Sequence, residues 1–199
     1  MKYGFCIIAA LAISTYAKAA DATVDNAEMK QIYEADQKDR DGFSAQTIDF
    51  GKLQPRDRAR RLRVRELIDQ GGLNTGKDYS RAALVFQHGE DADDILMAHI
   101  LAMTALGKGA ADARWLAATT LDRLLQRLGQ AHVFGTQFNY KIENGQPAWT
   151  MDPYNRTLIP ENLRKMNCVP GLKSQAEMLE AFSHNRAPTL EAPCAVPPQ

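Results

Sequence analysis

The chain has 199 residues, with 24 Lys and Arg balanced by 24 Asp and Glu, 45% hydrophobic residues, 9 prolines and 3 cysteines. This composition suits one ordinary folded domain and excludes a disordered, collagen-like or disulfide-dense chain. A formal net charge of +0 provides no overall field to attract a polyanion. We therefore expect no nucleic-acid partner.

The first 19 residues have the three parts of a secretory signal peptide. Lys2 provides a positive charge, residues 4–14 are almost wholly apolar, and Ala17 and Ala19 are the small residues that signal peptidase requires. The apolar run is about half of the ~20 residues that a membrane-spanning helix needs. We expect cleavage near Ala19, no transmembrane segment in the mature chain, and a periplasmic or secreted protein.

Cleavage would leave two cysteines, Cys168 and Cys194, in an oxidising compartment. No second pair of metal-ligating residues accompanies them, because the mature sequence contains no HxxxH, HxxE or CxxC pattern. We therefore predict a disulfide that ties the Pro-rich tail of residues 187–199 to the domain. Neither a metal ion nor a cofactor is expected.

Apolar residues recur at helical spacing along most of the chain. Residues 56–69 precede Gly71 and Gly72, which suit the left-handed end of a helix, and Asp78 is the expected N-cap of the third helix. The fourth segment is hydrophobic on all sides, which predicts a central buried helix. The expected helices cover residues 27–40, 56–69, 78–88, 92–106, 110–128, 160–166 and 173–183.

Residues 132–151 differ from the rest because aromatic-containing runs flank Asn144 and Gly145, a strong β-hairpin signal. An isolated hairpin is marginally stable, so we expect this one to lie against the helices. The predicted fold class is all-α: a compact bundle of antiparallel helices with a small C-terminal β-hairpin appendage. Residues 20–186 would form this single domain.

Several polar residues have both a structural and a functional interpretation. His99, within an apolar helix, is either a hydrogen-bonded core histidine or a base or ligand at the floor of a pocket. His88 suits the negative end of a helix dipole, and Asp36 with Arg40 has the spacing of an intrahelical ion pair. Six arginines between Arg56 and Arg65 form either a solvated helix face or a contact for an anionic envelope lipid or polymer.

The order of several short motifs is more distinctive than any one motif. The sequence contains Ala35-Asp36-Gln37 followed by Arg40, then Gln87-His88, Leu121-Asp122-Arg123 and Phe134-Gly135-Thr136-Gln137-Phe138. In this order they resemble a bacterial family of unknown function, the one numbered 6624, over about residues 27–140. The segment from Asn167 to Pro170 with Leu172 is similar to the family's downstream Val-Pro segment. The resemblance implies no particular reaction.

The resemblance brings together polar residues from separate predicted helices and the first hairpin strand. Arginine–carboxylate pairs could simply connect the helices, or the cluster could open as a pocket in which Arg40 and Arg123 hold an anionic group and Gln137 fixes its orientation. The leading hypothesis is an exported helical module that binds a small polar or anionic ligand, or an envelope protein partner. The alternative is a metal-independent hydrolase with His88 as general base, oriented by Asp36 or Asp122. The candidate site residues are Asp36, Arg40, His88, Asp122, Arg123 and Gln137.

Overall fold

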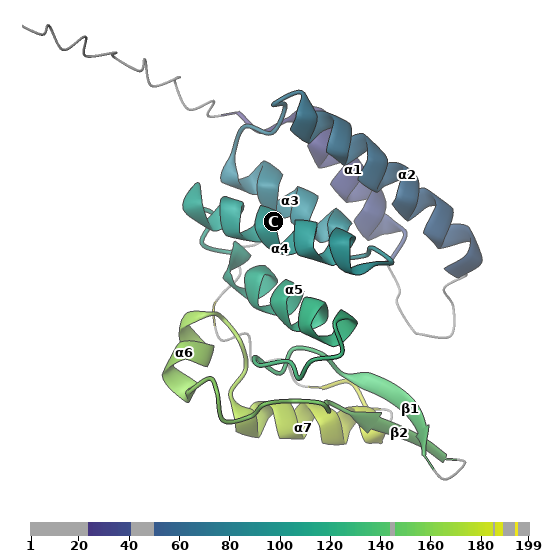
Figure 1. The fold of residues 1–199 in the computed structure, drawn as a ribbon, viewed down its shortest axis with the longest axis vertical. Helices are drawn as coiled ribbons and strands as arrows, with labels where there is room; N and C mark the ends of the chain where they lie inside the picture. Colours follow the sequence, from purple (N-terminus) through teal and green to yellow (C-terminus); the bar gives the residue numbers. More distant parts are fainter. Residues whose placement is uncertain (1–23, 41–49, 144–145, 185, 189–193, 195–199) are drawn as a thin grey trace, which may run out of the picture.

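The computed structural model describes residues 24–40, 50–143, 146–184, 186–188 and 194. The predicted signal peptide, the Asn144-Gly145 turn and most of the predicted Pro-rich tail lie outside these residues. The described chain is mostly helical with one small antiparallel sheet, as predicted (Figure 1). Its elements are α1 (Ala27–Lys38), α2 (Phe50–Asp69), α3 (Gly76–Phe86), α4 (Ala92–Gly107), α5 (Ala113–Arg127), β1 (Asn139–Glu143), β2 (Gln146–Thr150), α6 (Glu161–Met166) and α7 (Leu172–Ser183).

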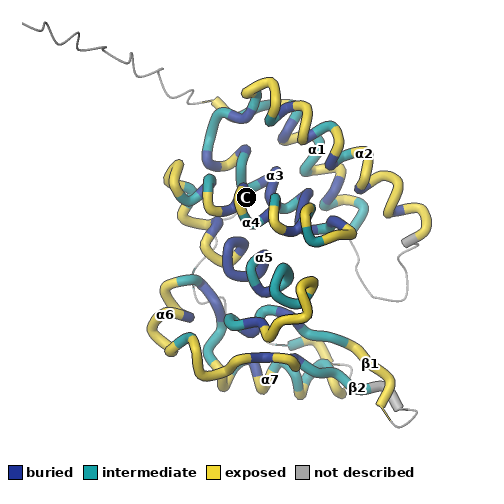
Figure 2. Tube along the Cα trace, viewed as in Figure 1, coloured by how far each residue is buried: buried dark blue, intermediate teal, exposed yellow. Residues whose placement is uncertain are grey.

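The apolar core lies among the first five helices. In Figure 1, α1 and α2 lie side by side, α3 and α4 follow beneath them, and α5 separates this layer from the hairpin and α7. Met29, Val64, Phe86 and Leu101 are the large core residues, and alanines of α3 and α4 let the helices approach closely. Figure 2 shows buried positions along α3, α4 and α5, whereas α2, α6 and α7 carry many exposed positions.

The helix α2 begins at Phe50, earlier than the predicted residue 56. The predicted start was wrong. Pro55 lies inside the helix, even though proline lacks the N–H that would donate to the preceding turn. Leu53 and Asp57, on either side of Pro55, are buried with 4% and 5% of their surface exposed. Contacts with the rest of the fold therefore stabilise a turn that local propensity disfavours.

The helix α3 begins at Gly76, and its N-cap is Thr75 instead of the predicted Asp78. The Asp78 N–H donates to Thr75 Oγ1 (3.1 Å), and the Asp78 carboxylate accepts from the Thr75 N–H (3.1 Å). This reciprocal arrangement is a capping box. Asp78 is fully buried and also accepts from the backbone of Asn26, so it joins the starts of α1 and α3.

The prediction that α4 is buried on all sides was wrong. Leu96, Ile100 and Met103 are 42%, 48% and 51% exposed, whereas Ala98 and Ala102 are fully buried. The helices α3 and α5 cover the inner sides of α4. The outer face of α4 is as apolar as a face in the core, so hydropathy alone could not show which face of the helix is exposed.

Within the described residues, no helix combines the length and apolarity needed to cross a membrane.

The predicted hairpin forms from β1 and β2, but over a shorter range than residues 132–151. The pair Glu143 and Gln146 closes the antiparallel register, and Asn139 lies opposite Thr150 at its other end. The hairpin packs on α7, where the Trp149 and Phe182 rings stack with centroids 5.2 Å apart. Packing against a helix supplies the support that an isolated two-stranded ribbon lacks.

Residues 131–138 form a loop between α5 and β1, so Gln137 precedes the strand in which it was predicted. Gly135 in this loop has a φ of +78°, a conformation that glycine adopts readily. A Cβ at Gly135 would lie 2.5 Å from the Tyr154 hydroxyl oxygen and 2.4 Å from Gln175 Oε1. The loop therefore needs glycine both for its backbone conformation and for its close packing.

The Sγ atoms of Cys168 and Cys194 lie 2.07 Å apart, at the bonding distance of the predicted disulfide. Cys168 follows α6 and is buried, with 7% of its surface exposed. The two residues are 26 positions apart, so the bond links the region after α6 to the C-terminal segment.

Candidate functional site

The six candidate residues lie in two groups that meet at the end of α3. The first group surrounds Asp36, which is fully buried on α1. Arg40 Nη1 donates to Asp36 Oδ1 (2.9 Å), and Gln37 Nε2 donates to Asp36 Oδ2 (2.9 Å). His88 Nδ1 lies 3.3 Å from the same carboxylate. Asp36, Arg40 and His88 are therefore brought together, as the cluster hypothesis required.

Further carboxylates of α1 and α2 surround the cations of this group. Arg40 Nη2 lies 2.7 Å from Asp57 Oδ2, and Arg60 Nη1 lies 3.1 Å from Asp57 Oδ1. Arg60 also pairs with Asp39. Arg40 is thus shared between two carboxylates and has little positive charge left to offer an anionic ligand. The group connects α1 to α2.

The second group surrounds Asp122, which is fully buried on α5. Its carboxylate accepts from the backbone N–H groups of Val133, Phe134 and Thr136, each at 2.9 Å, and from the Thr136 hydroxyl at 2.9 Å. His132 Nδ1 lies 3.1 Å away. Burial raises the pKa of Asp122, but the hydrogen bonds from the His132 side chain and the backbone N–H groups together lower it by more. The pKa therefore lies below its ordinary value of 3.8. Asp122 organises the loop after α5 and does not orient His88.

Arg123 connects the two groups. Its Nε donates to Gln137 Oε1 (3.3 Å), and its Nη1 donates to the carbonyl oxygen of Gln87 (2.7 Å), the residue before His88. Gln137 Nε2 in turn donates to Thr119 Oγ1 (2.9 Å). Burial, and then the nearby charge of Arg127, lower the pKa of Arg123. No carboxylate in the described part of the chain forms an ion pair with Arg123.

His132 was missed from the sequence, although it occupies the centre of the second group. It is fully buried, its Nε2 contacts the carbonyl oxygen of Met151, and its ring stacks on Tyr154 with centroids 4.7 Å apart. The neighbouring Phe134-to-Phe138 motif was the available signal of a buried polar group, because a loop that turns its backbone N–H groups inward needs a hydrogen-bond acceptor for them. Nothing in the sequence identified Asp122 as that acceptor or His132 as its second partner.

Arg164 and Gln175 hold the same loop from its other side. Arg164 Nη1 donates to the Phe134 carbonyl oxygen (2.6 Å), and Gln175 Nε2 donates to that oxygen at 2.7 Å. Both side chains are buried, with 0% and 2% exposed. The Phe134-to-Phe138 motif is therefore explained by a tightly bonded loop, which is a structural role.

His99 has the contacts of a hydrogen-bonded core histidine. Its Nδ1 lies 3.1 Å from the Ala117 carbonyl oxygen and 3.2 Å from Thr120 Oγ1, both on α5. Burial lowers the pKa of His99 from its ordinary value of 6.5, and the contact with Ala117 raises it by a smaller amount. These contacts favour the structural interpretation of His99.

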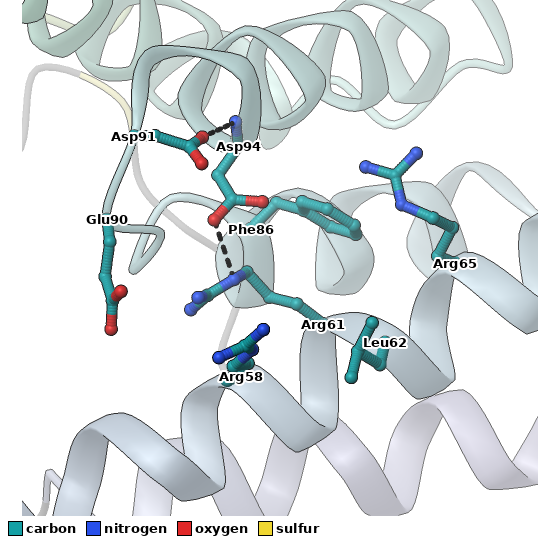
Figure 3. Close-up of a pocket in the computed structure, with 8 residues that line it drawn as sticks. All are labelled: Arg58, Arg61, Leu62, Arg65, Phe86, Glu90, Asp91 and Asp94. Atoms are coloured by element: carbon teal, nitrogen blue, oxygen red, sulfur yellow. Dashed lines mark hydrogen bonds and ion pairs between the residues drawn. The ribbon is translucent and has the colours of Figure 1, made fainter.

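A hollow of about 330 Å³ opens between α2 and the segment that joins α3 to α4 (Figure 3). Arg58, Arg61, Leu62 and Arg65 approach it from α2, and Phe86 lies between the two sides. The other rim carries the carboxylates of Glu90, Asp91 and Asp94.

The three arginines of this hollow differ in whether a carboxylate pairs with them. Arg61 Nε lies 2.9 Å from Asp94 Oδ2, and its Nη1 donates to the carbonyl oxygen of His88 (3.3 Å). Arg65 Cζ lies 5.5 Å from the centroid of the Phe86 ring. Arg58 and Arg65 are exposed and form no ion pair with any described carboxylate. The hollow therefore contains two guanidinium groups that can receive an anion.

A larger hollow of about 1160 Å³ lies between α1, α3 and the turn after α4. Its charges are mixed and several are paired internally: Arg81 Nη1 lies 2.9 Å from Asp25 Oδ2, and Lys30 Nζ lies 3.6 Å from Glu34 Oε1. Arg81, the arginine that lines this hollow, is paired with Asp25, so the hollow offers an anion lysine ammonium groups but no unpaired guanidinium group.

Among the residues that the structure describes, no group of three or more His, Cys, Asp or Glu side chains is placed to hold a metal ion. Comparison with known protein families, characterised proteins and solved structures finds no match to this chain.

Proposed function

We propose that the protein is an exported, compact helical module that binds a small anionic ligand in the hollow beside α2. The observation that supports this proposal is the pair of exposed guanidinium groups, Arg58 and Arg65, without carboxylate partners in the described chain, beside Phe86. Guanidinium groups bind carboxylates and phosphates through paired hydrogen bonds. A volume of about 330 Å³ suits a small molecule.

The two rims of the hollow restrict the class of ligand. Leu62, which is 57% exposed, offers apolar surface beside the guanidinium groups, whereas Phe86 is fully buried, so the ligand should carry an apolar body next to its anionic group. Glu90 and Asp91 on the other rim would repel a second negative charge. We therefore expect an aromatic or aliphatic monoanion to bind better than a compact polyanion.

Isothermal titration calorimetry with benzoate, citrate and benzyl alcohol tests the proposal. Benzoate should bind, citrate should bind more weakly because of the acidic rim, and benzyl alcohol should not bind because it lacks the charge. An Arg58→Gln/Arg65→Gln variant should weaken benzoate binding by roughly tenfold or more. Arg63→Gln is the matched control, because Arg63 lies on the same helix but pairs with Glu28.

The same titration distinguishes the site that the sequence predicted. If Arg123→Gln abolishes benzoate binding while the α2 double variant retains it, the ligand binds beside Arg123 and Gln137. If neither the Arg58→Gln/Arg65→Gln variant nor Arg123→Gln affects binding, or no probe binds, the anion-binding proposal is wrong.

The second candidate function is a metal-independent hydrolase with His88 as general base. The contact of His88 Nδ1 with Asp36 at 3.3 Å favours it, because a carboxylate that orients an imidazole is a common feature of base catalysis. Turnover of chromogenic esters by the purified protein, lost in His88→Gln at unchanged melting temperature, would support this function. Equal rates in the two proteins would exclude His88 as the base.

Export is supported by the charged, apolar and small-residue segments of residues 1–19. Cell fractionation and N-terminal sequencing test it directly. A mature protein that begins near Ala20 in the periplasm or medium is the expected result, and an uncleaved cytoplasmic chain would contradict it.

A further inference from the structure

The hollow beside α2 contains two carboxylates that the proposed anion site does not use. Glu90 and Asp91 line it from the segment that joins α3 to α4, across from the arginines of α2 (Figure 3). Both residues are exposed, and neither forms an ion pair with a described cation. Asp91 Oδ1 accepts from the Asp94 N–H (2.8 Å) as the N-cap of α4. Its Oδ2 and both carboxylate oxygens of Glu90 have no hydrogen-bond donor among the described residues.

The other charges of the hollow leave two cations opposite these two carboxylates. Arg61 Nε lies 2.9 Å from Asp94 Oδ2, so this arginine and this acid neutralise each other. Arg58 and Arg65 are left without a described counter-ion. A ligand with only a negative charge would be attracted by the two guanidinium groups and repelled by the two carboxylates. A ligand that carries one charge of each sign would be attracted by both sides of the hollow.

An apolar side chain lies beside the two guanidinium groups. Leu62 is four residues after Arg58 and three residues before Arg65, so the three side chains share one face of α2. Leu62 also lines the hollow and is 57% exposed. Apolar surface on the ligand would remove this side chain from water, which adds free energy to the attraction between charges.

We propose that the ligand of this hollow is a zwitterion with an apolar body, the chemistry of a free amino acid or dipeptide with an apolar side chain. Its carboxylate binds Arg58 and Arg65, its ammonium group binds Glu90 and Asp91, and its apolar side chain lies on Leu62. This inference rests on the proposed function, because the ligand's anionic group binds the same two arginines. It adds a site for a cationic group on the opposite side of the hollow.

Isothermal titration calorimetry of the purified protein with four probes separates the contributions of the two charges. The zwitterions are phenylalanine and the dipeptide alanyl-phenylalanine, which differ in the distance between their charges. Phenylpropionate lacks only the ammonium group of phenylalanine, and phenethylamine lacks only its carboxylate. At least one zwitterion should bind roughly tenfold or more tightly than phenylpropionate, and phenethylamine should bind most weakly because the arginines repel it. The tighter zwitterion shows whether the amino acid or the dipeptide spans the hollow.

A Glu90→Gln/Asp91→Asn variant should change the affinities for the two kinds of probe in opposite directions. It should weaken binding of the tighter zwitterion roughly tenfold, and it should strengthen binding of phenylpropionate, because the carboxylates that repel this anion are gone. Asparagine at position 91 retains an N-cap acceptor for α4. Asp93→Asn is the matched control, because Asp93 is exposed in the first turn of α4 but does not line the hollow. Circular dichroism melting verifies that each variant is folded.

The outcomes distinguish this inference from the proposed function. Equal affinities for phenylpropionate and the zwitterions would overturn the inference and leave the proposed anion site intact. A zwitterion preference that persists in the Glu90→Gln/Asp91→Asn variant would also overturn it, because the ammonium group would then bind elsewhere. If neither the zwitterions nor phenylpropionate bind, the proposed function fails together with the inference.

Discussion

Asp122 shows how one buried carboxylate can determine the path of a loop. It accepts hydrogen bonds from three backbone N–H groups and a hydroxyl within residues 133–136, and it faces His132. Those N–H groups would otherwise be buried without an acceptor, which costs free energy for each group. The residue was selected from the sequence as a possible ligand-binding group, and its contacts favour a structural role.

Asp122→Asn should lower the free energy of unfolding by ~2 to 4 kcal/mol, because the amide replaces a charged acceptor and brings N–H donors toward other donors. Urea denaturation measures this change. Asp152→Asn is the control: Asp152 is 63% exposed and pairs with Arg156 at 2.7 Å. Its effect should stay within ~0.5 kcal/mol, as is usual for exposed ion pairs. Equal effects of both substitutions would contradict the role assigned to Asp122.

His99 should make stability depend on pH. Burial lowers its pKa in the folded protein below the ordinary value of 6.5, so the folded state favours the neutral imidazole. The contribution is fully present above pH 6.5 and is lost as the pH falls below it, because the unfolded chain binds the proton more tightly. His99→Gln cannot titrate, so wild-type stability should fall more steeply than variant stability between about pH 7 and pH 5. Parallel stability curves for the two proteins would exclude this role.

At the scale of elements, the presence of each helix was more predictable than its boundaries. All seven expected helices are present, since their apolar spacing and end signals act locally. The start of α2 was predicted too late because Pro55 is tolerated where Leu53 and Asp57 are buried. The outer face of α4 was misjudged because an apolar sequence does not reveal which faces of a helix the rest of the fold covers.

The capping box of α3 allows a direct test at this scale. Thr75→Ala removes the acceptor of the Asp78 N–H and the hydroxyl that donates to Asp25 Oδ1 at 2.7 Å. The free energy of unfolding should fall by ~1 to 2 kcal/mol, as for other N-cap replacements. Thr75→Ser retains the hydroxyl and should restore most of this loss in the same denaturation measurement. A serine variant as unstable as the alanine variant would show that the methyl group, not the cap, is responsible.

At the scale of the whole molecule, the N-terminal helices and the C-terminal region are stabilised by different kinds of contact. The apolar core of α1 to α5 draws its members from Met29 to Ala117. The C-terminal region is attached through hydrogen bonds of the loop before β1, aromatic contacts such as Phe138 with Phe182, and the link between Cys168 and Cys194. Regions with fewer buried apolar contacts open at lower free energy.

Hydrogen exchange followed by mass spectrometry should reveal this difference. Amides of α3 and α4 should exchange roughly tenfold or more slowly than amides of α7 and the hairpin, because opening the former requires disruption of the core. Asp122→Asn should accelerate exchange in α7 and the hairpin much more than in α3. Uniform exchange throughout the chain, with uniform acceleration in the variant, would contradict a C-terminal region that opens separately.

The sequence by itself determined the helical class, the position of the hairpin and the cysteine pair, because periodicity, turn residues and capping act over a few residues. Export and the resemblance to the family numbered 6624 stay predictions that rest on the residues quoted for them. The tertiary structure decided the partners of the polar residues: Asp36 meets His88 across 52 positions, and Asp122 meets His132. It also brought Arg58 and Arg65 beside Phe86. Such contacts depend on how the helices pack, and local sequence carries no record of which distant side chain will satisfy a buried charge.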